Sequence, residues 1–157
     1  MDLSNLVQIV RDSRDLTAMV FPLPDVDGCV DYAITEAGET LDAILREKRT
    51  GDKRNNSKQS DVRKEWGQCG YMIASAMIQI DGCEMESDNS MSYIYSVFEL
   101  LCAFRMSPSE IAWHLADALE IWQSFCHVNA WDAAELMAET CNAFERKHLP
   151  ELFEVAA

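Results

Sequence analysis

Long apolar runs, a basic overall charge and strand-like alternation are all missing from this sequence. Its longest strongly apolar segments fall far short of the roughly 18 residues that a membrane-spanning helix needs, so no such helix is expected. Acidic residues outnumber basic ones by 27 to 13, giving a net charge of −14. This charge argues against a nucleic acid polymer as a partner, because phosphate backbones attract basic surfaces. The absence of polar–apolar alternation argues against β-strands.

Several signals of compartment and chemistry are absent as well. Residues 1–5 contain neither a basic segment nor an apolar one, so no secretory signal is expected and a cytoplasmic location is predicted. The six cysteines include no Cys-x-x-Cys pair, and several occupy apolar helical positions, which predicts reduced thiols in the core. Glycine-rich phosphate loops and nucleophile motifs do not occur.

The residues that are present predict one all-α domain that covers residues 1–157. The composition is ordinary for a globular protein, with 48% hydrophobic and 25% charged residues, and apolar positions recur at helical spacing. We expect a bundle of about five to six helices, with a motif core at about residues 25–82 and C-terminal helices at 89–148. The expected helices cover about residues 3–19, 25–48, 61–80, 89–106, 107–127 and 130–147.

Local sequence also predicts where several of these helices begin and end. Residues 107–110, Ser-Pro-Ser-Glu, form a capping box with proline at the first helical position. Asn129 is expected to cap the last helix, and Pro150 to follow its end. Gly82 is expected to end the third helix, since glycine is the usual residue at a helix C-terminus.

Two short motifs place acidic and polar residues on neighbouring helices. Glu36 and Glu39 are three residues apart, so they lie one turn apart on the same side of one helix, and Glu65 and Gln68 repeat this spacing on the next. Two helices joined by a short connection usually pack antiparallel, which can bring the motifs together. Close carboxylates repel one another unless a cation neutralises them, and hard oxygen ligands favour Mg²⁺ or Mn²⁺. The predicted metal ligands are Glu36, Glu39, Glu65 and Gln68.

A solvated acidic face is the ordinary alternative, because Glu-x-x-Glu is common on amphipathic helices. Two glycines favour the metal site over that alternative. Gly38 lies in mid-helix between the first two glutamates, where glycine costs about 1 kcal/mol relative to alanine. Gly67 has the matching place in the second motif. Close approach of another group would explain both glycines.

A basic segment joins the two motifs. Residues 46–64 hold eight of the thirteen Lys and Arg residues and only three acidic residues. The Gly/Asn/Ser-rich stretch 50–60 within it is predicted to be a mobile loop. One interpretation is a solvated loop that offsets an acidic protein. The other is that its side chains hold the phosphates of a ligand bound at the glutamates. The candidates are Lys48, Lys53, Arg54, Lys58 and Arg63.

The stretch 36–39, Glu-Ala-Gly-Glu, followed by the stretch 65–68, Glu-Trp-Gly-Gln, resembles the MazG-type all-α nucleoside triphosphate pyrophosphatases, relatives of the dimeric dUTPases. Their pattern is Glu-x-x-Glu on one helix and Glu-x-x-Asp on the next. The similarity covers roughly residues 30–80, about a third of the chain. Gln68 departs from the pattern at the aspartate position, and its amide oxygen is a weaker ligand for Mg²⁺ than a carboxylate.

The resemblance implies a metal-dependent enzyme with a MazG-like four-helix core. The implied reaction is hydrolysis of a (deoxy)nucleoside triphosphate to the monophosphate and pyrophosphate, with Mg²⁺ or Mn²⁺ as cofactor and with Glu36, Glu39 and Glu65 as catalytic residues. It also implies a homodimer or homotetramer, and a role in nucleotide-pool control in a bacterium or a phage. The alternative is a helical interaction protein on the same scaffold, with catalysis impaired at Gln68.

Histidines offer weaker candidate sites. Glu145 and His148 form a Glu-x-x-His motif, but di-iron helix bundles need two such motifs and further glutamates. His114 and His127 lie 13 residues apart, without the spacing of metal ligands. Both are expected at the surface or as satisfied histidines in the core.

Overall fold

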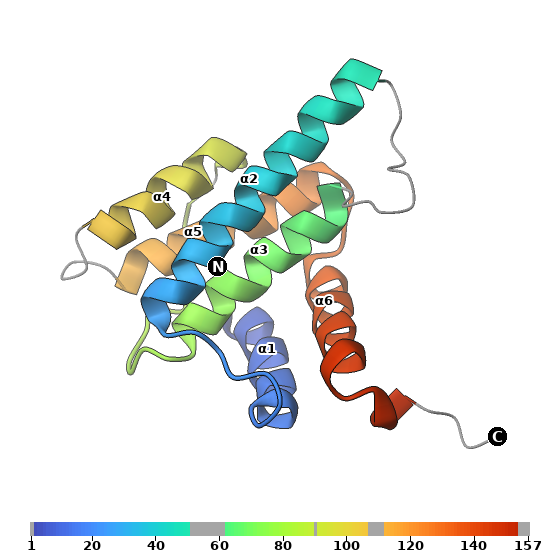
Figure 1. Ribbon diagram of the computed structural model, residues 1–157. Helices are drawn as coiled ribbons and strands as arrows, with labels where there is room; N and C mark the ends of the chain where they lie inside the picture. The colour runs from blue at the N-terminus through green and yellow to red at the C-terminus, as the bar shows by residue number, and fades with distance from the viewer. Residues whose placement is uncertain (1, 51–61, 90, 107–111, 154–157) are drawn as a thin grey trace.

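The computed structural model describes residues 2–50, 62–89, 91–106 and 112–153, and it confirms the all-α prediction for them (Figure 1). Apart from an isolated bridge between Asp2 and Glu86, these ranges contain no strand pairing. The elements are α1 (Ser4–Thr17), α2 (Val26–Thr50), α3 (Val62–Met77), α4 (Ile94–Met106), α5 (Ala112–Val128), α6 (Ala133–His148) and the short 3₁₀ helix η2 (Pro150–Phe153).

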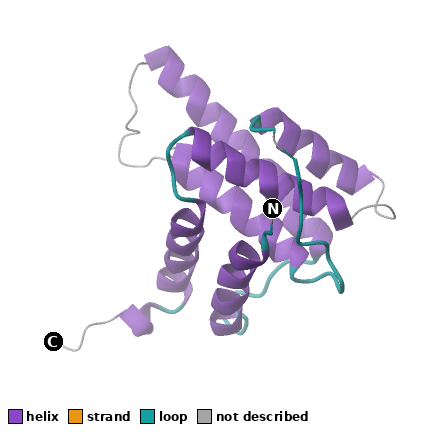
Figure 2. Cartoon of the chain, turned by 180° about the vertical axis from the view of Figure 1, so that it is seen from behind, coloured by secondary structure: helices purple, strands orange, loops and turns teal. Residues whose placement is uncertain are grey.

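Helix α3 lies at the centre of the bundle. It packs against α1, α2, α5 and α6, and thirteen of its 16 residues are buried. Helix α2 runs antiparallel beside α3 and extends past it at the C-terminal end (Figure 1). Helix α4 packs against α2 and α5, while α1 and α6 pack together at another side of the bundle, which is visible from behind in Figure 2.

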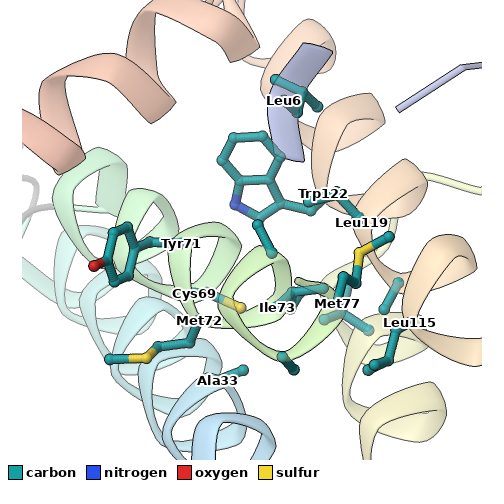
Figure 3. Close-up of a cluster of buried hydrophobic side chains, with 14 of the residues drawn as sticks. Leu6, Ala33, Cys69, Tyr71, Met72, Ile73, Met77, Leu115, Leu119 and Trp122 are labelled. Carbon is teal, nitrogen blue, oxygen red and sulfur yellow. The ribbon is translucent and has the colours of Figure 1, made fainter. Parts of the chain in front are cut away.

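The core forms where α3 meets α5. Ile73 and Met77 of α3 are fully buried, as are Leu115, Leu119 and Trp122 of α5. Figure 3 shows the α5 side chains directed toward α3. Burying side chains of this size stabilises the fold by about 1.5–3 kcal/mol each, so this junction is a main source of stability.

Two tryptophans join α3 to α5. Trp66 Nε1 donates a hydrogen bond to the carbonyl oxygen of Trp122 at 3.0 Å, and Trp122 Nε1 donates to the carbonyl oxygen of Trp66 at 2.6 Å. Gly70 permits this approach, because a Cβ atom at that position would overlap the Trp122 ring. Both indoles are therefore fully buried with their N–H groups satisfied, as buried polar groups require.

A buried arginine ties the connection between α1 and α2 to the core. Arg14 Nη1 donates to Thr17 Oγ1 at 3.0 Å and lies 3.4 Å from the hydroxyl oxygen of Tyr71 on α3. Its Nη2 donates to the carbonyl oxygen of Phe21, and the guanidinium lies 5.2 Å from the centre of the Phe21 ring. These contacts fix the segment that leads into α2.

The N-terminal cap predicted for the last helix is wrong. Asp132, not Asn129, caps α6, since its side chain accepts a hydrogen bond from the backbone N–H of Glu135 at 2.8 Å. Asn129 instead belongs to the end of α5, where its side-chain amide donates to the carbonyl oxygen of Phe125 at 2.9 Å. Asp132 lies three residues before Glu135 and can accept from its backbone N–H, whereas Asn129 is a further three residues away and cannot reach this donor.

Helices α3 and α4 differ most from their predicted bounds. Helix α3 ends at Met77, and Gly82 adopts a positive φ of 69° in the turn that follows rather than at the helix end itself. Helix α4 begins at Ile94 rather than at Asn89, because Asn89 Oδ1 accepts a hydrogen bond from the backbone N–H of Met91 at 3.0 Å. Such local side-chain bonds compete with helix formation. The capping box at 107–110 lies outside the described residues.

None of the helices in the described part of the chain combines the length and the apolar character of a membrane crossing.

Candidate metal centre

The structure brings Glu36, Glu39 and Glu65 together. Each offers one carboxylate oxygen, and these three oxygens lie within 4.8 Å of one another. Glu36 and Glu39 occupy consecutive turns of α2, and Glu65 lies in the first turn of α3. The antiparallel packing of α2 and α3 produces this meeting, because it sets the middle of α2 beside the first turn of α3. We refer to these three residues as the glutamate cluster.

The glutamate cluster is buried on one side and open on the other. Glu65 is only 4% exposed, Glu36 is half-buried and Glu39 is exposed. Oε2 of Glu36 is itself buried and has no hydrogen-bond partner among the described residues. Buried polar atoms in native proteins nearly always have a partner, so this oxygen indicates a place for a further group.

Burial, hydrogen bonding and mutual repulsion raise the pKa values of Glu36 and Glu39 in the protein without a cation. Burial, then a hydrogen bond with Glu65 and the charges of Glu39 and Glu65, raise the pKa of Glu36 from 4.5 to about 9. The pKa of Glu39 is also raised, first by its hydrogen bond with Glu65 and then by burial. At neutral pH the protein alone therefore keeps a proton on Glu36, which relieves part of the repulsion.

Carboxylate oxygens in this arrangement fit a hard divalent cation. Mg²⁺ and Mn²⁺ prefer oxygen ligands, and Mg²⁺ takes about six, so three carboxylates leave positions for water or phosphate oxygens. The open side at Glu39 leaves room for such ligands. Cys69 lies nearby but does not suit the same role, because burial, and then the charge of Glu36, raise the pKa of its thiol far above the ordinary range.

Gln68, the fourth predicted ligand, lies one turn after Glu65 on α3 and is half-buried. Its side chain lines a cavity of about 530 Å³ between α3 and α6. We refer to this space as the α3–α6 cavity. Its lining residues are Arg63, Lys64, Gln68, Leu136, Glu139, Thr140, Ala143, Phe144 and Lys147.

The predicted phosphate-binding residues fall into three groups. Arg63 lies at the α3–α6 cavity and forms an ion pair with Glu139 of α6, with Nη2 3.2 Å from Oε1. Lys48 is exposed in the last turn of α2. The remaining candidates, Lys53, Arg54 and Lys58, lie outside the described residues, as does most of the basic segment.

The two glycines of the motifs differ in their surroundings. A Cβ atom at Gly67 would overlap Thr140 and crowd Leu136, so the close approach at this position is that of α6. A Cβ atom at Gly38 would meet only Phe98 of α4, at an ordinary contact distance of 3.9 Å. Helix packing therefore explains Gly67, and nothing in the described part of the chain requires glycine at position 38.

The cysteines and the histidine motif have structural surroundings. All six cysteines are free thiols, and four of them, Cys29, Cys69, Cys126 and Cys141, are buried as predicted. The prediction of a core position is wrong for Cys102, which is exposed, and Cys83 is only half-buried. His148 stacks on Phe21, with ring centres 4.2 Å apart, so its imidazole packs against the connection between α1 and α2.

Sequence reasoning missed the contribution of α6. Six of its residues, at positions 136, 139, 140, 143, 144 and 147, line the α3–α6 cavity. Their spacing of three and four residues marks one helical face, which was available as a signal. It was not informative alone, because the same spacing describes an ordinary packing face, and because the partner of that face is not evident from the sequence.

Comparisons with models of protein families, with curated proteins and with solved structures each gave no match.

Proposed function

We propose that this protein is a metal-dependent hydrolase that converts a (deoxy)nucleoside triphosphate to the monophosphate and pyrophosphate. The observation that carries the proposal is the meeting of three carboxylates from two helices, within 4.8 Å, at a partly open position. Repulsion within such a cluster favours the binding of a divalent cation. The resemblance of the stretches 36–39 and 65–68 to the MazG-type enzymes suggests the type of reaction.

In this proposal Glu36, Glu39 and Glu65 hold Mg²⁺ or Mn²⁺. When bound, the cation neutralises phosphate oxygens and makes a water molecule more acidic. Glu39 is the most exposed of the three, so its carboxylate is the best placed to accept a proton from water.

In the proposed reaction, water attacks the α-phosphorus of the nucleotide. The oxygen of water bonds to the α-phosphorus while one proton of this water passes to the Glu39 carboxylate. The bond from this phosphorus to the oxygen that bridges to the β-phosphate breaks. Pyrophosphate leaves with the electron pair of that bond, and negative charge builds up on its oxygens. Arg63 and Lys64, the basic side chains of the α3–α6 cavity that flank Glu65 in the chain, stabilise this charge by hydrogen bonding.

The proposal is tested by measuring pyrophosphate release from the common ribo- and deoxynucleoside triphosphates with Mg²⁺, Mn²⁺ or EDTA. We expect metal-dependent release from at least one of them, and loss of release in the Glu65→Gln variant. Glu99→Gln is the matched control, since Glu99 is an exposed glutamate of α4 outside the cluster, and it should retain activity.

A helical interaction protein is the second candidate. Gln68 favours it, because a neutral amide stands where the resembling enzymes have an aspartate. Mn²⁺ binding without pyrophosphate release from any of the nucleotides would support this candidate and contradict the hydrolase. Assembly as a homodimer or homotetramer, the role in nucleotide-pool control and the cytoplasmic location stay predictions.

A further inference from the structure

The α3–α6 cavity has the size and the lining of a site for an amphipathic anion. Its volume of about 530 Å³ lies within the usual range of small-molecule sites, which is roughly 300–1,000 Å³. Leu136, Ala143 and Phe144 provide apolar surface on α6. Three basic side chains and one acidic side chain also line it, a local excess of positive charge in a protein of net charge −14.

Polar groups for orienting a ligand are present as well. Thr140 is 7% exposed, and its hydroxyl donates to the carbonyl oxygen of Leu136 at 2.9 Å, which leaves the oxygen lone pairs as acceptors. Gln68 adds an amide that both donates and accepts hydrogen bonds. A few placed polar groups on an apolar surface are typical of sites for small organic ligands.

The cavity and the glutamate cluster share helix α3. Arg63, Lys64 and Gln68 line the cavity, while Glu65, between them in the chain, belongs to the cluster. Successive residues of a helix point about 100° apart, so the cavity and the cluster border neighbouring sides of α3 within about one turn, or roughly 5 Å. A ligand with phosphates at the cluster can therefore extend into the cavity.

We propose that the α3–α6 cavity binds the nucleoside portion of the substrate, and that Gln68 contacts this portion rather than the metal. The inference rests on the proposed function for the identity of the substrate. It assigns the base and sugar to the apolar surface of α6 and to the polar groups of Gln68 and Thr140. Arg63 and Lys64, which flank Glu65 in the chain, lie at the phosphate end. The ligand class is a nucleoside 5′-phosphate.

Ala143 and its neighbour allow a matched test. Both Ala143 and Asn142 are exposed positions of α6, so tryptophan is tolerated at either, but only Ala143 lines the cavity. Ala143→Trp should fill the cavity. We expect wild type to bind at least one of the common nucleoside 5′-monophosphates in EDTA by calorimetry, Ala143→Trp to bind it roughly tenfold or more weakly, and Asn142→Trp to bind it normally.

Gln68→Leu tests the role of the amide, because it keeps the side-chain size and removes the hydrogen-bonding groups without changing the charge. We expect severalfold weaker binding of the nucleoside monophosphate and unchanged binding of Mn²⁺. Weaker Mn²⁺ binding in this variant would make Gln68 a metal ligand and overturn the assignment.

The outcomes separate this inference from the hydrolase itself. Failure of wild type to bind any nucleoside monophosphate, or normal binding by Ala143→Trp, overturns the cavity assignment even if pyrophosphate is released. Conversely, loss of nucleotide binding in Ala143→Trp, together with no hydrolysis by wild type, supports the cavity as a nucleotide site and contradicts the proposed function.

Discussion

Two adjacent residues of α3 show opposite ways of placing polar groups inside a helical bundle. Trp66 exchanges hydrogen bonds with Trp122, and each indole N–H meets a carbonyl oxygen. Glu65, the residue before it, meets two further carboxyl groups, and burial raises the pKa of one of them, Glu36, to about 9. The protein alone satisfies the tryptophan junction, whereas the glutamate cluster needs protons or a cation. The first arrangement holds the fold, and the second suits a ligand.

The largest effect on stability is expected at the tryptophan junction, by which we mean the hydrogen-bonded pair Trp66 and Trp122. Trp122→Ala removes a fully buried side chain and leaves the carbonyl oxygen of Trp66 without the indole donor. We expect a loss of about 3–5 kcal/mol in the free energy of unfolding. Urea denaturation followed by circular dichroism measures it, with Ser124→Ala on the same helix as a control. A loss below about 1 kcal/mol would show that the junction does not hold the fold.

In the metal-free protein, removing a carboxylate of the glutamate cluster should stabilise the fold, whereas removing Trp122 should destabilise it. Because the pKa of Glu36 is higher in the folded state than in the unfolded chain, the folded state holds more protons between pH 4.5 and about 9. Its stability should therefore fall as pH rises through this window, and the effect should vanish below it. Glu36→Gln mimics the protonated side chain, so it should flatten this dependence and raise the melting temperature at pH 8 by a few degrees.

Thermal unfolding of both proteins from pH 5 to pH 9 in EDTA makes this comparison. Glu99→Gln again serves as the control for a lost negative charge on this acidic protein. A Glu36→Gln variant that melts below wild type at pH 8 would mean that the ionised carboxylate stabilises the fold, and it would contradict repulsion within the glutamate cluster.

Substitutions at Gly67 and Gly38 should change the free energy of unfolding by smaller amounts, and in opposite directions. Gly67→Ala should destabilise the protein by about 1–3 kcal/mol, because the added methyl group overlaps α6. Gly38→Ala should stabilise it by about 0.5–1 kcal/mol, because the added methyl group finds ordinary space in the middle of a helix. Denaturant midpoints of the two variants test both signs. Equal losses in both would mean that α2 is as closely packed at Gly38 as α3 is at Gly67.

Much of the fold follows from the sequence because helical spacing determines it locally. The repeat of apolar positions predicted six helices, and all six occur in the described part of the chain. The errors are local as well. Asn129 and Asp132 are both residue types that favour helix N-caps. Which of them caps α6 depends on where α5 ends, and the hydrogen bond from the Asn129 side chain to the carbonyl oxygen of Phe125 keeps Asn129 at the end of α5.

The candidate site was predictable only where its residues share a short motif. The spacing of Glu36 and Glu39, and the antiparallel packing of α2 on α3, follow from neighbouring segments of the chain. The α3–α6 cavity was not predictable, because it depends on contacts between distant residues, such as Arg63 with Glu139, which are 76 positions apart. Gly67 is a sequence signal of the close packing of α6 on α3, but the sequence does not show which helix approaches this glycine.

Calorimetric titration of Mn²⁺ into the metal-free protein at pH 7.5 tests the central claim most directly. Run in two buffers with different heats of ionisation, it reports both the affinity and the protons released. Because the pKa of Glu36 is about 9, we predict that Mn²⁺ binding releases about one proton. We also predict that Glu36→Gln binds Mn²⁺ roughly tenfold or more weakly, and without that release. Absence of Mn²⁺ binding, or binding that is unaltered in Glu36→Gln, would contradict a metal site at the glutamate cluster.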